Sequence, residues 1–286
     1  MRVDNRYDIL SKLGSGAFSK VFSGKDIISG EDVAIKIDTS NVKSGQRSRA
    51  LVIYEGDILA WLHKEDKIRG IPRLYWSGYI NSKNNTKYPV IIIDKLGDDL
   101  EKVLLKRTLS CIEMGHIGLA LIRIIESIHT RGVLHRDLKP ANIMLGYHDT
   151  DLYIADFGLA KKFINNNNEH ISYCDNKSGV TGTLRYCSTY THYGVESCRR
   201  DDLQSFLYIL IFMLKGSLPW QSINHKAGKN DVGKTKSRMF FDYSLCNDCP
   251  KQLLTINKHI ASLEFSESPD HKLISSELSD MILSQM

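Results

Sequence analysis

The chain has 286 residues, of which 42% are hydrophobic and 25% are charged, and its net charge is +5. This length suits one large domain or two lobes around a cleft, and the composition is that of an ordinary globular protein. The positive charge is too mild to indicate nucleic-acid binding, and it favours acidic or phosphorylated partners. No apolar signal-peptide core follows Met1, and the longest apolar run, Phe206 to Leu214, is about half of a membrane span. We therefore expect an intracellular protein, in the cytoplasm, the nucleus or both.

The six cysteines give little reason to expect a metal site. Only Cys246 and Cys249 form a Cys-x-x-Cys pair, and no second pair of ligands stands near them in the sequence. A pair of free thiols is therefore the better interpretation than a zinc site. Reduced thiols also agree with the intracellular location.

The segment from Tyr7 to Asp38 alternates apolar and polar residues between turn signals, which predicts three antiparallel strands. A loop with glycines lies between the first two strands, and a backbone without Cβ atoms can approach phosphate groups closely. Alone, this loop also fits a flexible hairpin. However, Val33-Ala34-Ile35-Lys36 follows on the third strand, and such a lysine can neutralise the α- and β-phosphates of a nucleotide. The candidate nucleotide-binding residues of this region are Leu13, Gly14, Ser15, Gly16, Ala17, Phe18, Ser19, Lys20, Val21, Ala34 and Lys36.

Apolar residues from Gly45 to His63 recur near a period of 3.6 residues, which predicts a helix. Glu55 lies within this helix and can pair with Lys36, which would hold the lysine on the phosphates. An ordinary surface glutamate is the alternative for Glu55.

The segment from Ile71 to Asp94 predicts two further strands separated by a polar insertion. The four residues from Asp94 to Gly97 then read as a hinge between lobes. Backbone groups near Leu96 would meet adenine, because a purine edge needs one donor and one acceptor in line. Ile93 would stand at the back of the nucleotide pocket.

From Asp98 onward the sequence predicts helices. Asp98 or Asp99 can cap a helix from Leu100 to Lys106. The stretch from Asp202 to Leu214 is apolar almost all round, which predicts a buried helix. Asp202 either caps that helix, or hydrogen-bonds the backbone of the polar loop described next, or does both. The other predicted segments are a long amphipathic helix from Cys111 to Arg131, a basic surface loop from Lys226 to Arg238 and two short helices within Leu253 to Met286.

The polar loop from His135 to Asn142 is the feature on which the functional interpretation rests. It reads HRDLKPAN, and Asp156-Phe157-Gly158 follows with its aspartate fourteen residues after the asparagine. Asp137 can accept a hydroxyl proton, whereas Asn142 and Asp156 supply the hard oxygen ligands that Mg²⁺ requires. The combination predicts a phosphoryl-transfer site.

The glycine loop, VAIK, HRDLKPAN and DFG, in this order and over the whole chain, resemble the motif set of protein kinases. In place of the usual Ala-Pro-Glu, the chain reads GTLRYCSTYTHYG from Gly182, then RRDD from Arg199 and GSLPWQ from Gly216. This pattern resembles the casein kinase I family. The chain departs from it in two places: Ser188-Thr189-Tyr190 replaces the family's Ser-Ile-Asn, and Gln204 replaces a common glutamate.

The resemblance implies an α+β, two-lobed kinase fold. Residues 1–95 would form a small, mainly antiparallel β N-lobe with one helix, and residues 96–286 a larger, mainly helical C-lobe. The resemblance also implies a monomeric serine/threonine kinase that uses ATP and Mg²⁺ and acts without phosphorylation of its activation segment. A dual-specificity kinase is the alternative, although Lys139 favours serine and threonine substrates. The catalytic residues would be Asp137, Lys139 and Asn142, and the metal ligands Asn142 and Asp156.

The same resemblance implies a preference for serines that lie shortly after acidic or already phosphorylated residues. In the family, basic residues near the peptide cleft hold a phosphate upstream of the target, and Arg185 matches its motif directly. Arginine suits this task because its planar fork can hold two phosphate oxygens at once. The alternative is that Arg185 pairs with a structural carboxylate. The other candidates for this anion site are Lys177, Lys226 and Lys229.

Two other classes of protein compete with this interpretation. A kinase-fold scaffold (pseudokinase) would act by binding alone, but such proteins usually lose residues that stand here as Lys36, Asp137 and Asp156. A small-molecule phosphotransferase of kinase-like fold would share the catalytic aspartate and asparagine, but not RRDD or GSLPWQ. Roles of the family in DNA repair, trafficking or signalling all remain open.

Overall fold

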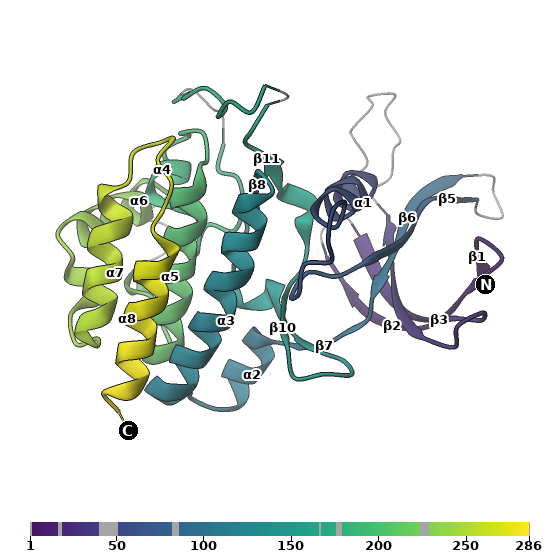
Figure 1. Ribbon diagram of the computed structural model, residues 1–286, viewed down its shortest axis with the longest axis horizontal. Coiled ribbons are helices and arrows are strands. Elements are labelled where there is room, and N and C mark those ends of the chain that lie inside the picture. Colours follow the sequence, from purple (N-terminus) through teal and green to yellow (C-terminus); the bar gives the residue numbers. More distant parts are fainter. Residues whose placement is uncertain are drawn as a thin grey trace. The chain divides into compact units, whose positions relative to one another are not determined.

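Figure 1 shows the computed structural model of the chain, which describes residues 2–16, 19–39, 51–81, 86–165, 167–175, 179–223 and 229–285. The chain divides into two compact units. The first contains Met1–Gly97 and Leu145–Gly158, and the second contains Asp98–Met144 and Leu159–Met286. The first unit is built on an antiparallel sheet and the second is mainly helical, so the predicted α+β architecture of two lobes is confirmed.

The sheet of the first unit has six strands in the order β1-β2-β3-β4-β6-β5, and neighbouring strands are antiparallel. Val33 and Ile35 of one strand share a buried cluster with Val90 and Ile92 of another, as the two-residue period of a strand requires. The three strands predicted up to Asp38 and the two predicted up to Asp94 are confirmed. The strands are β1 (Arg2–Val3), β2 (Tyr7–Ser15), β3 (Ser19–Asp26), β4 (Asp32–Asp38), β5 (Leu74–Asn81) and β6 (Lys87–Asp94).

Helix α1 (Leu51–Leu62) lies against β4, β5 and β6, as Figure 1 shows. A glycine faces the sheet at the contact: a Cβ on Gly56 would lie only 3.0 Å from Cγ2 of Ile91. Glycine therefore lets the helix approach the sheet closely, and this approach brings Glu55 toward β4. The part of the predicted helix that precedes residue 51 lies outside the described residues.

The second unit is organised around a buried helix, α5 (Arg199–Lys215), which confirms the prediction for this stretch. Helix α3 (Cys111–Thr130) packs against α5 and α8 (His271–Leu283), and α7 (Lys251–Ser262) packs against the same two helices (Figure 1). Gly118 of α3 permits this close packing, because a Cβ there would lie 3.1 Å from Leu210 of α5. The two predicted C-terminal helices are thus present as α7 and α8.

The helix starts follow the expected capping chemistry. Helix α2 (Leu100–Lys106) begins after Asp99, whose side chain accepts the backbone N–H of Lys102 at 2.8 Å. Ser110 and Glu113 form a reciprocal capping box at the start of α3. At the start of α5, Asp201 accepts the backbone N–H of Cys198 at 2.8 Å.

The prediction of a surface loop from Lys226 to Arg238 is wrong from Lys229 onward, where helix α6 (Lys229–Phe241) forms. The basic residues and Gly233 suggested a solvated loop. In the structure, Gly233 faces α4 (Thr189–His192), and a Cβ there would collide with the His192 ring. The glycine therefore serves close packing between two helices rather than a turn.

Several short elements complete the chain. Strand β9 lies between β10 and β7 in a small sheet, and β8 pairs with β11. No helix of the described residues is long and apolar enough to cross a membrane. The short elements are β7 (Leu96–Asp99), β8 (Val133–Leu134), β9 (Ile143–Gly146), β10 (Leu152–Ile154), β11 (Lys161–Lys162) and the 3-10 turns Pro140–Asn142, Phe157–Leu159, Pro219–Ser222 and Ser244–Cys246.

Candidate active site

Lys36 forms two ion pairs within the first unit. Its Nζ lies 2.6 Å from Oε2 of Glu55 and 2.8 Å from Oδ1 of Asp156. Lys36 projects from β4, Glu55 comes from α1, and Asp156 follows β10. The Lys36–Glu55 pair expected from the sequence is therefore present, and Asp156 is a second partner of the same ammonium.

Burial sets the charges of this group. The side chains of Lys36 and Glu55 are 12% and 2% exposed, whereas that of Asp156 is 48% exposed. Burial alone would lower the pKa of Lys36, but the carboxylates of Glu55 and Asp156 raise it well above its ordinary value. Burial raises the pKa of Glu55, and Lys36 offsets part of that effect. Lys36 thus stays charged, and Asp156 presents an accessible carboxylate beside it.

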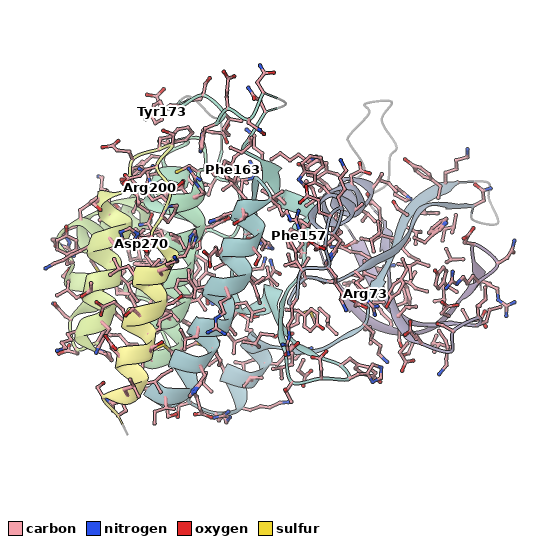
Figure 2. The ribbon with its side chains drawn as sticks, viewed as in Figure 1. Arg73, Phe157, Phe163, Tyr173, Arg200 and Asp270 are labelled. Atoms are coloured by element: carbon pink, nitrogen blue, oxygen red, sulfur yellow. The ribbon has the colours of Figure 1, made fainter. Side chains whose placement is uncertain are left out.

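The backbone at Asp156 has an uncommon conformation that aims this carboxylate. Its φ is 65°, which costs a non-glycine residue about 1–2 kcal/mol. The next residue, Phe157, is fully buried (Figure 2), and its backbone N–H donates to Glu55. Anchoring of the phenylalanine therefore holds the neighbouring aspartate in its strained geometry, as is common at functional sites.

A polar cluster fixes the end of β6, just before the predicted hinge. Arg73, seen in Figure 2, places Nη2 2.9 Å from Oδ1 of Asp94, and the Tyr75 hydroxyl donates to the same oxygen at 2.7 Å. Burial would raise the pKa of Asp94, but the Arg73 guanidinium and the other hydrogen bonds hold it below its ordinary value. Because Asp94 stands two residues before Leu96, the cluster constrains the backbone that would meet adenine.

Two apolar candidates for the nucleotide pocket face each other across the sheet. Ala34 of β4 and Ile93 of β6 are direct partners in the antiparallel register. Ala34 is buried and Ile93 is half-buried. Both side chains therefore lie on the same face of the sheet, where an apolar surface suits the flat ring of a base.

The glycine loop joins β2 to β3. Gly16 closes it by donating its backbone N–H to the carbonyl of Ser19 at 2.8 Å, and nothing lies within 4 Å of a Cβ placed on Gly14. The register between the two strands shifts near the loop, which indicates bulges. Val21 is the direct partner of Lys36 on β4, so the loop leads to the lysine. Of the remaining candidates, Leu13 and Ser15 lie on β2 and Lys20 lies on β3, whereas Ala17 and Phe18 lie outside the described residues.

In the second unit, three side chains hold Asp137. Lys139 donates from Nζ to Oδ2 of Asp137 at 2.6 Å, and Asn142 donates from Nδ2 to the carbonyl oxygen of Asp137 at 2.9 Å. Thr183 donates to Oδ1 both from its backbone N–H and from its hydroxyl, each at 2.7 Å. The structure thus brings together the three predicted catalytic residues and fixes the orientation of the carboxylate.

Thr183 is a residue of the site that the sequence analysis did not single out. Its hydroxyl also accepts a hydrogen bond from Nζ of Lys139 at 3.0 Å. The preceding Gly182 has a φ of 86°, and a Cβ on it would collide with the carbonyl oxygen of Arg136. The Gly-Thr dipeptide within GTLRY was the available signal in the sequence. Only glycine allows this close approach to the polar loop from His135 to Asn142, which is the predicted catalytic loop.

Asp202 holds the backbone of the catalytic loop through hydrogen bonds. It accepts the backbone N–H groups of His135 and Arg136, each at 2.8 Å, and Nε2 of His129 donates to it at 3.1 Å. Burial would raise the pKa of Asp202, but these partners hold it below its ordinary value. The anchoring role considered for Asp202 is therefore observed, while the carboxylate at the start of α5 that caps the helix is that of Asp201.

Arg185 is exposed and follows Thr183 by two residues. Its carbonyl oxygen accepts Nε1 of Trp220 at 2.8 Å. The carbonyl oxygens on either side, of Leu184 and Cys187, accept Nζ of Lys236 at 2.7 Å each. Hydrogen bonds from Trp220 and Lys236 thus hold the backbone around Arg185, while the Arg185 side chain is exposed to solvent. Among the described residues no carboxylate pairs with it, and its guanidinium carbon lies 5.9 Å from the centre of the Tyr186 ring.

The lysines proposed for the anion site cannot be compared with Arg185. Lys177 and Lys226 lie outside the described residues. Lys229 is the first residue of α6, and its side chain is likewise outside the described part of the structure. Arg185 therefore carries the structural argument for this site.

Thr189 and Gln204, two buried polar residues of the second unit, contact each other. Oε1 of Gln204 accepts the backbone N–H of Thr189 at 3.1 Å, and the Thr189 hydroxyl lies 3.2 Å from the same amide. Nε2 of Gln204 donates to the hydroxyl of Tyr208 at 2.7 Å. Thr189 and Gln204 are both buried, so the amide is fully used inside the protein.

Each unit contributes one side chain with an oxygen of the kind that a divalent cation binds. Asn142 uses its amide nitrogen on Asp137, so its oxygen is the end left for a metal. Asp156 offers a half-exposed carboxylate oxygen. Mg²⁺ prefers such oxygens and commonly completes its shell with phosphates and water. No group of three or more His, Cys, Asp or Glu residues in the described ranges forms a metal cage.

Comparison with known protein families agrees with this geometry. A family model described as "Protein kinase domain" matches residues 7–284. The match covers nearly the whole chain, including all elements from β2 to α8.

Proposed function

Because this chain belongs to the protein kinase domain family, we propose that it is a serine/threonine kinase of the casein kinase I type, acting on acidic or pre-phosphorylated proteins. Protein kinases in general use ATP and Mg²⁺. The observation that carries the proposal is the geometry of Asp137, whose carboxylate is fixed by hydrogen bonds from Lys139 and Thr183, which suits a positioned catalytic base.

Each group of side chains has a separate task in the transfer of the γ-phosphate. Lys36, kept charged by Glu55, would bind the α- and β-phosphates. Asp156 and the oxygen of Asn142 would hold Mg²⁺, which supplies charge neutralisation at the phosphates. Asp137 would accept the proton of the substrate hydroxyl and orient that hydroxyl, and Lys139 would place its positive charge beside the reacting groups.

The type of kinase is inferred from the motifs around Arg185. GTLRYCSTYTHYG, RRDD and GSLPWQ support the casein kinase I type, and Lys139, two residues after Asp137, supports serine and threonine substrates by its resemblance to the family motif. An arginine without a carboxylate partner among the described residues, two positions from a residue that contacts Asp137, suits a substrate anion upstream of the target. We also infer a monomer that works in the cytoplasm, the nucleus or both, without prior phosphorylation of its activation segment.

The test compares two peptides that differ only in a phosphoserine three residues before the target serine. We expect a higher kcat/KM for the phosphorylated peptide, and we expect Arg185→Ala to remove most of that advantage. Arg185→Lys is the matched control: it keeps the charge but loses the planar fork, so it should retain part of the advantage. Raising the salt concentration should shrink the advantage, because the attraction is partly screened.

Two results would overturn this assignment. If the wild-type protein treats both peptides alike, the preference for phosphorylated substrates is absent. If Arg185→Ala slows both peptides equally, the arginine supports the structure rather than the anion. Phosphoamino-acid analysis of the product distinguishes a serine/threonine kinase from a dual-specificity kinase.

A further inference from the structure

A cavity of about 350 Å³ opens beside Arg185 in the second unit. Apolar side chains of two helices form much of its wall: Leu104 and Leu105 of α2, and Phe212 and Met213 of α5. Arg185 lies on the same wall, but no residue of the catalytic loop does. This volume is at the lower end of ligand pockets, so it suits one or two side chains better than a large ligand.

Arg185 connects the cavity to the residues that hold Asp137 in the second unit. Thr183 contacts Asp137 through two hydrogen bonds, and Arg185 follows two residues later. Tyr186 donates its backbone N–H to the carbonyl of Thr183 at 2.9 Å, so these residues form a compact turn. An extended peptide rises about 3.3 Å per residue, so an anion three positions before the target lies about 10 Å from it, within reach of an arginine here. Residues still further upstream then reach the apolar wall.

The charges around the cavity favour one anion rather than a run of them. Arg185 has no carboxylate partner among the described residues. The other arginine on the wall, Arg107, is already paired with Glu113 at 2.7 Å. Glu101 adds a negative charge to the lining. A second acidic residue next to the bound anion would therefore meet a carboxylate and apolar carbon instead of a free cation.

One leucine of the cavity wall is largely exposed to solvent. Leu105 is 82% exposed, although it lines the cavity together with better-buried apolar side chains. A single exposed leucine is common on protein surfaces and has no meaning alone. Its position on the rim of an apolar cavity that also holds Arg185 gives it a role, since a substrate side chain would cover it.

We propose that this cavity receives an apolar side chain of the substrate polypeptide, immediately N-terminal to the anionic residue that Arg185 binds. The kinase would then prefer a leucine-like residue before the phosphoserine and reject an acidic one at that position. This inference rests on the proposed function, because it takes the orientation of the substrate from the anion at Arg185.

The test uses three peptides with phosphoserine three residues before the target and leucine, serine or aspartate immediately before the phosphoserine. We expect kcat/KM to be about fivefold higher with leucine than with serine, the effect of burying roughly half of a leucine side chain. Aspartate should give the lowest value. Glu101→Gln should raise kcat/KM for the aspartate peptide by about threefold, in line with the weak coupling of exposed charges.

Leu105→Ser should remove most of the difference between the leucine and serine peptides. Leu283→Ser is the matched control, because Leu283 is also exposed (66%) and helical but does not line the cavity. It should leave the leucine preference intact. The same peptides with alanine at the target position, labelled with a fluorophore, give dissociation constants by anisotropy and so report binding without turnover.

The outcomes separate this inference from the proposed function. Equal values for the leucine and serine peptides, or a leucine preference that Leu105→Ser leaves unchanged, would defeat the cavity assignment even if phosphoserine still helps. If phosphoserine gives no advantage but the leucine preference persists and depends on Leu105, the cavity stands and the anion site fails. If Glu101→Gln leaves kcat/KM for the aspartate peptide unchanged, the proposed repulsion between Glu101 and an acidic substrate residue is wrong.

Discussion

The ammonium of Lys236 lies 2.7 Å from the carbonyl oxygen of Cys187, in a place where none of the lysine side chain is exposed to solvent. Burial lowers the pKa of Lys236 to about 8, and the nearby Cys187 thiol offsets part of that effect. The lysine therefore holds the backbone on both sides of Arg185 from within the core. A lysine in this state makes the stability of the segment depend on pH.

We expect the free energy of unfolding to rise with pH because of Lys236. The pKa is about 8 in the folded protein and about 10.5 when the chain is unfolded, so between these values only the unfolded chain binds the proton. The cost of burying the ammonium is therefore absent above pH 10.5, grows as the pH falls from 10.5 to 8, and stays constant below 8. The free energies of unfolding of the wild type and of Lys236→Met, measured with urea, should therefore differ by about 2 kcal/mol more at pH 9.5 than at pH 8.

Both proteins should carry Cys187→Ala in that experiment, because the ionisable Cys187 thiol contacts the Lys236 ammonium and any change in its charge would add to the measured difference. At pH 7, Lys236→Met should already be less stable by about 1–3 kcal/mol, since two carbonyl oxygens lose their donor. A stability difference that does not change between pH 8 and 9.5 would show that Lys236 keeps an ordinary pKa.

Asp137→Asn should abolish turnover while nucleotide binding survives. The amide cannot accept the substrate proton, and loss of a positioned base costs about a hundredfold or more. Lys139 and Thr183 would also lose their charged partner. Phosphate transfer by the purified variant measures the first effect, and titration with a fluorescent nucleotide measures the second. Near-normal phosphorylation would refute the role of Asp137.

The Thr183 hydroxyl should matter through its two contacts, with Asp137 and with Lys139. Thr183→Val keeps the shape of the side chain but removes the hydroxyl, and we expect kcat to fall by about ten- to a hundredfold because the base is less well positioned. Thr183→Ser restores a hydroxyl and should recover most of the activity. Equal loss in both variants, with unchanged melting temperature, would mean that the methyl group and not the hydroxyl is needed.

Lys36→Ala and Asp156→Ala should both lose activity, but for different reasons. Lys36 would orient phosphates and Asp156 would hold the metal, so raising Mg²⁺ or Mn²⁺ should partly rescue only Asp156→Ala. Activity measured across a metal titration checks this. Rescue of Lys36→Ala by added metal would contradict the division of roles.

The sequence was informative where chemistry needs fixed residue types at fixed spacing. It located Lys36, Glu55 and Asp137 and most of the helices and strands, because the motifs and the apolar periods are local signals. It did not show that Asp156 joins the Lys36–Glu55 pair, since that contact joins segments 120 positions apart. Long-range contacts follow from packing, which local patterns do not encode.

Helix α6 illustrates why some parts of the fold could not be predicted from the sequence. Its segment is basic and contains a glycine, and lysines are almost never fully buried. Lys236 is the exception, because the carbonyl oxygens of Leu184 and Cys187 satisfy its donors inside the protein. Only the position of residues 184–187 in the fold reveals these partners, so the helix and its buried lysine could be found only in the structure.

The contact between Thr189 and Gln204 bears on how this kinase diverged from its relatives. Each residue alone looks like an isolated replacement, but one buried amide joins them. Glutamate at 204 would bury a carboxylate there, and an isoleucine at 189 would leave the amide without its hydroxyl partner. We therefore expect the two positions to vary together among related kinases, so that threonine at the first is accompanied by glutamine at the second.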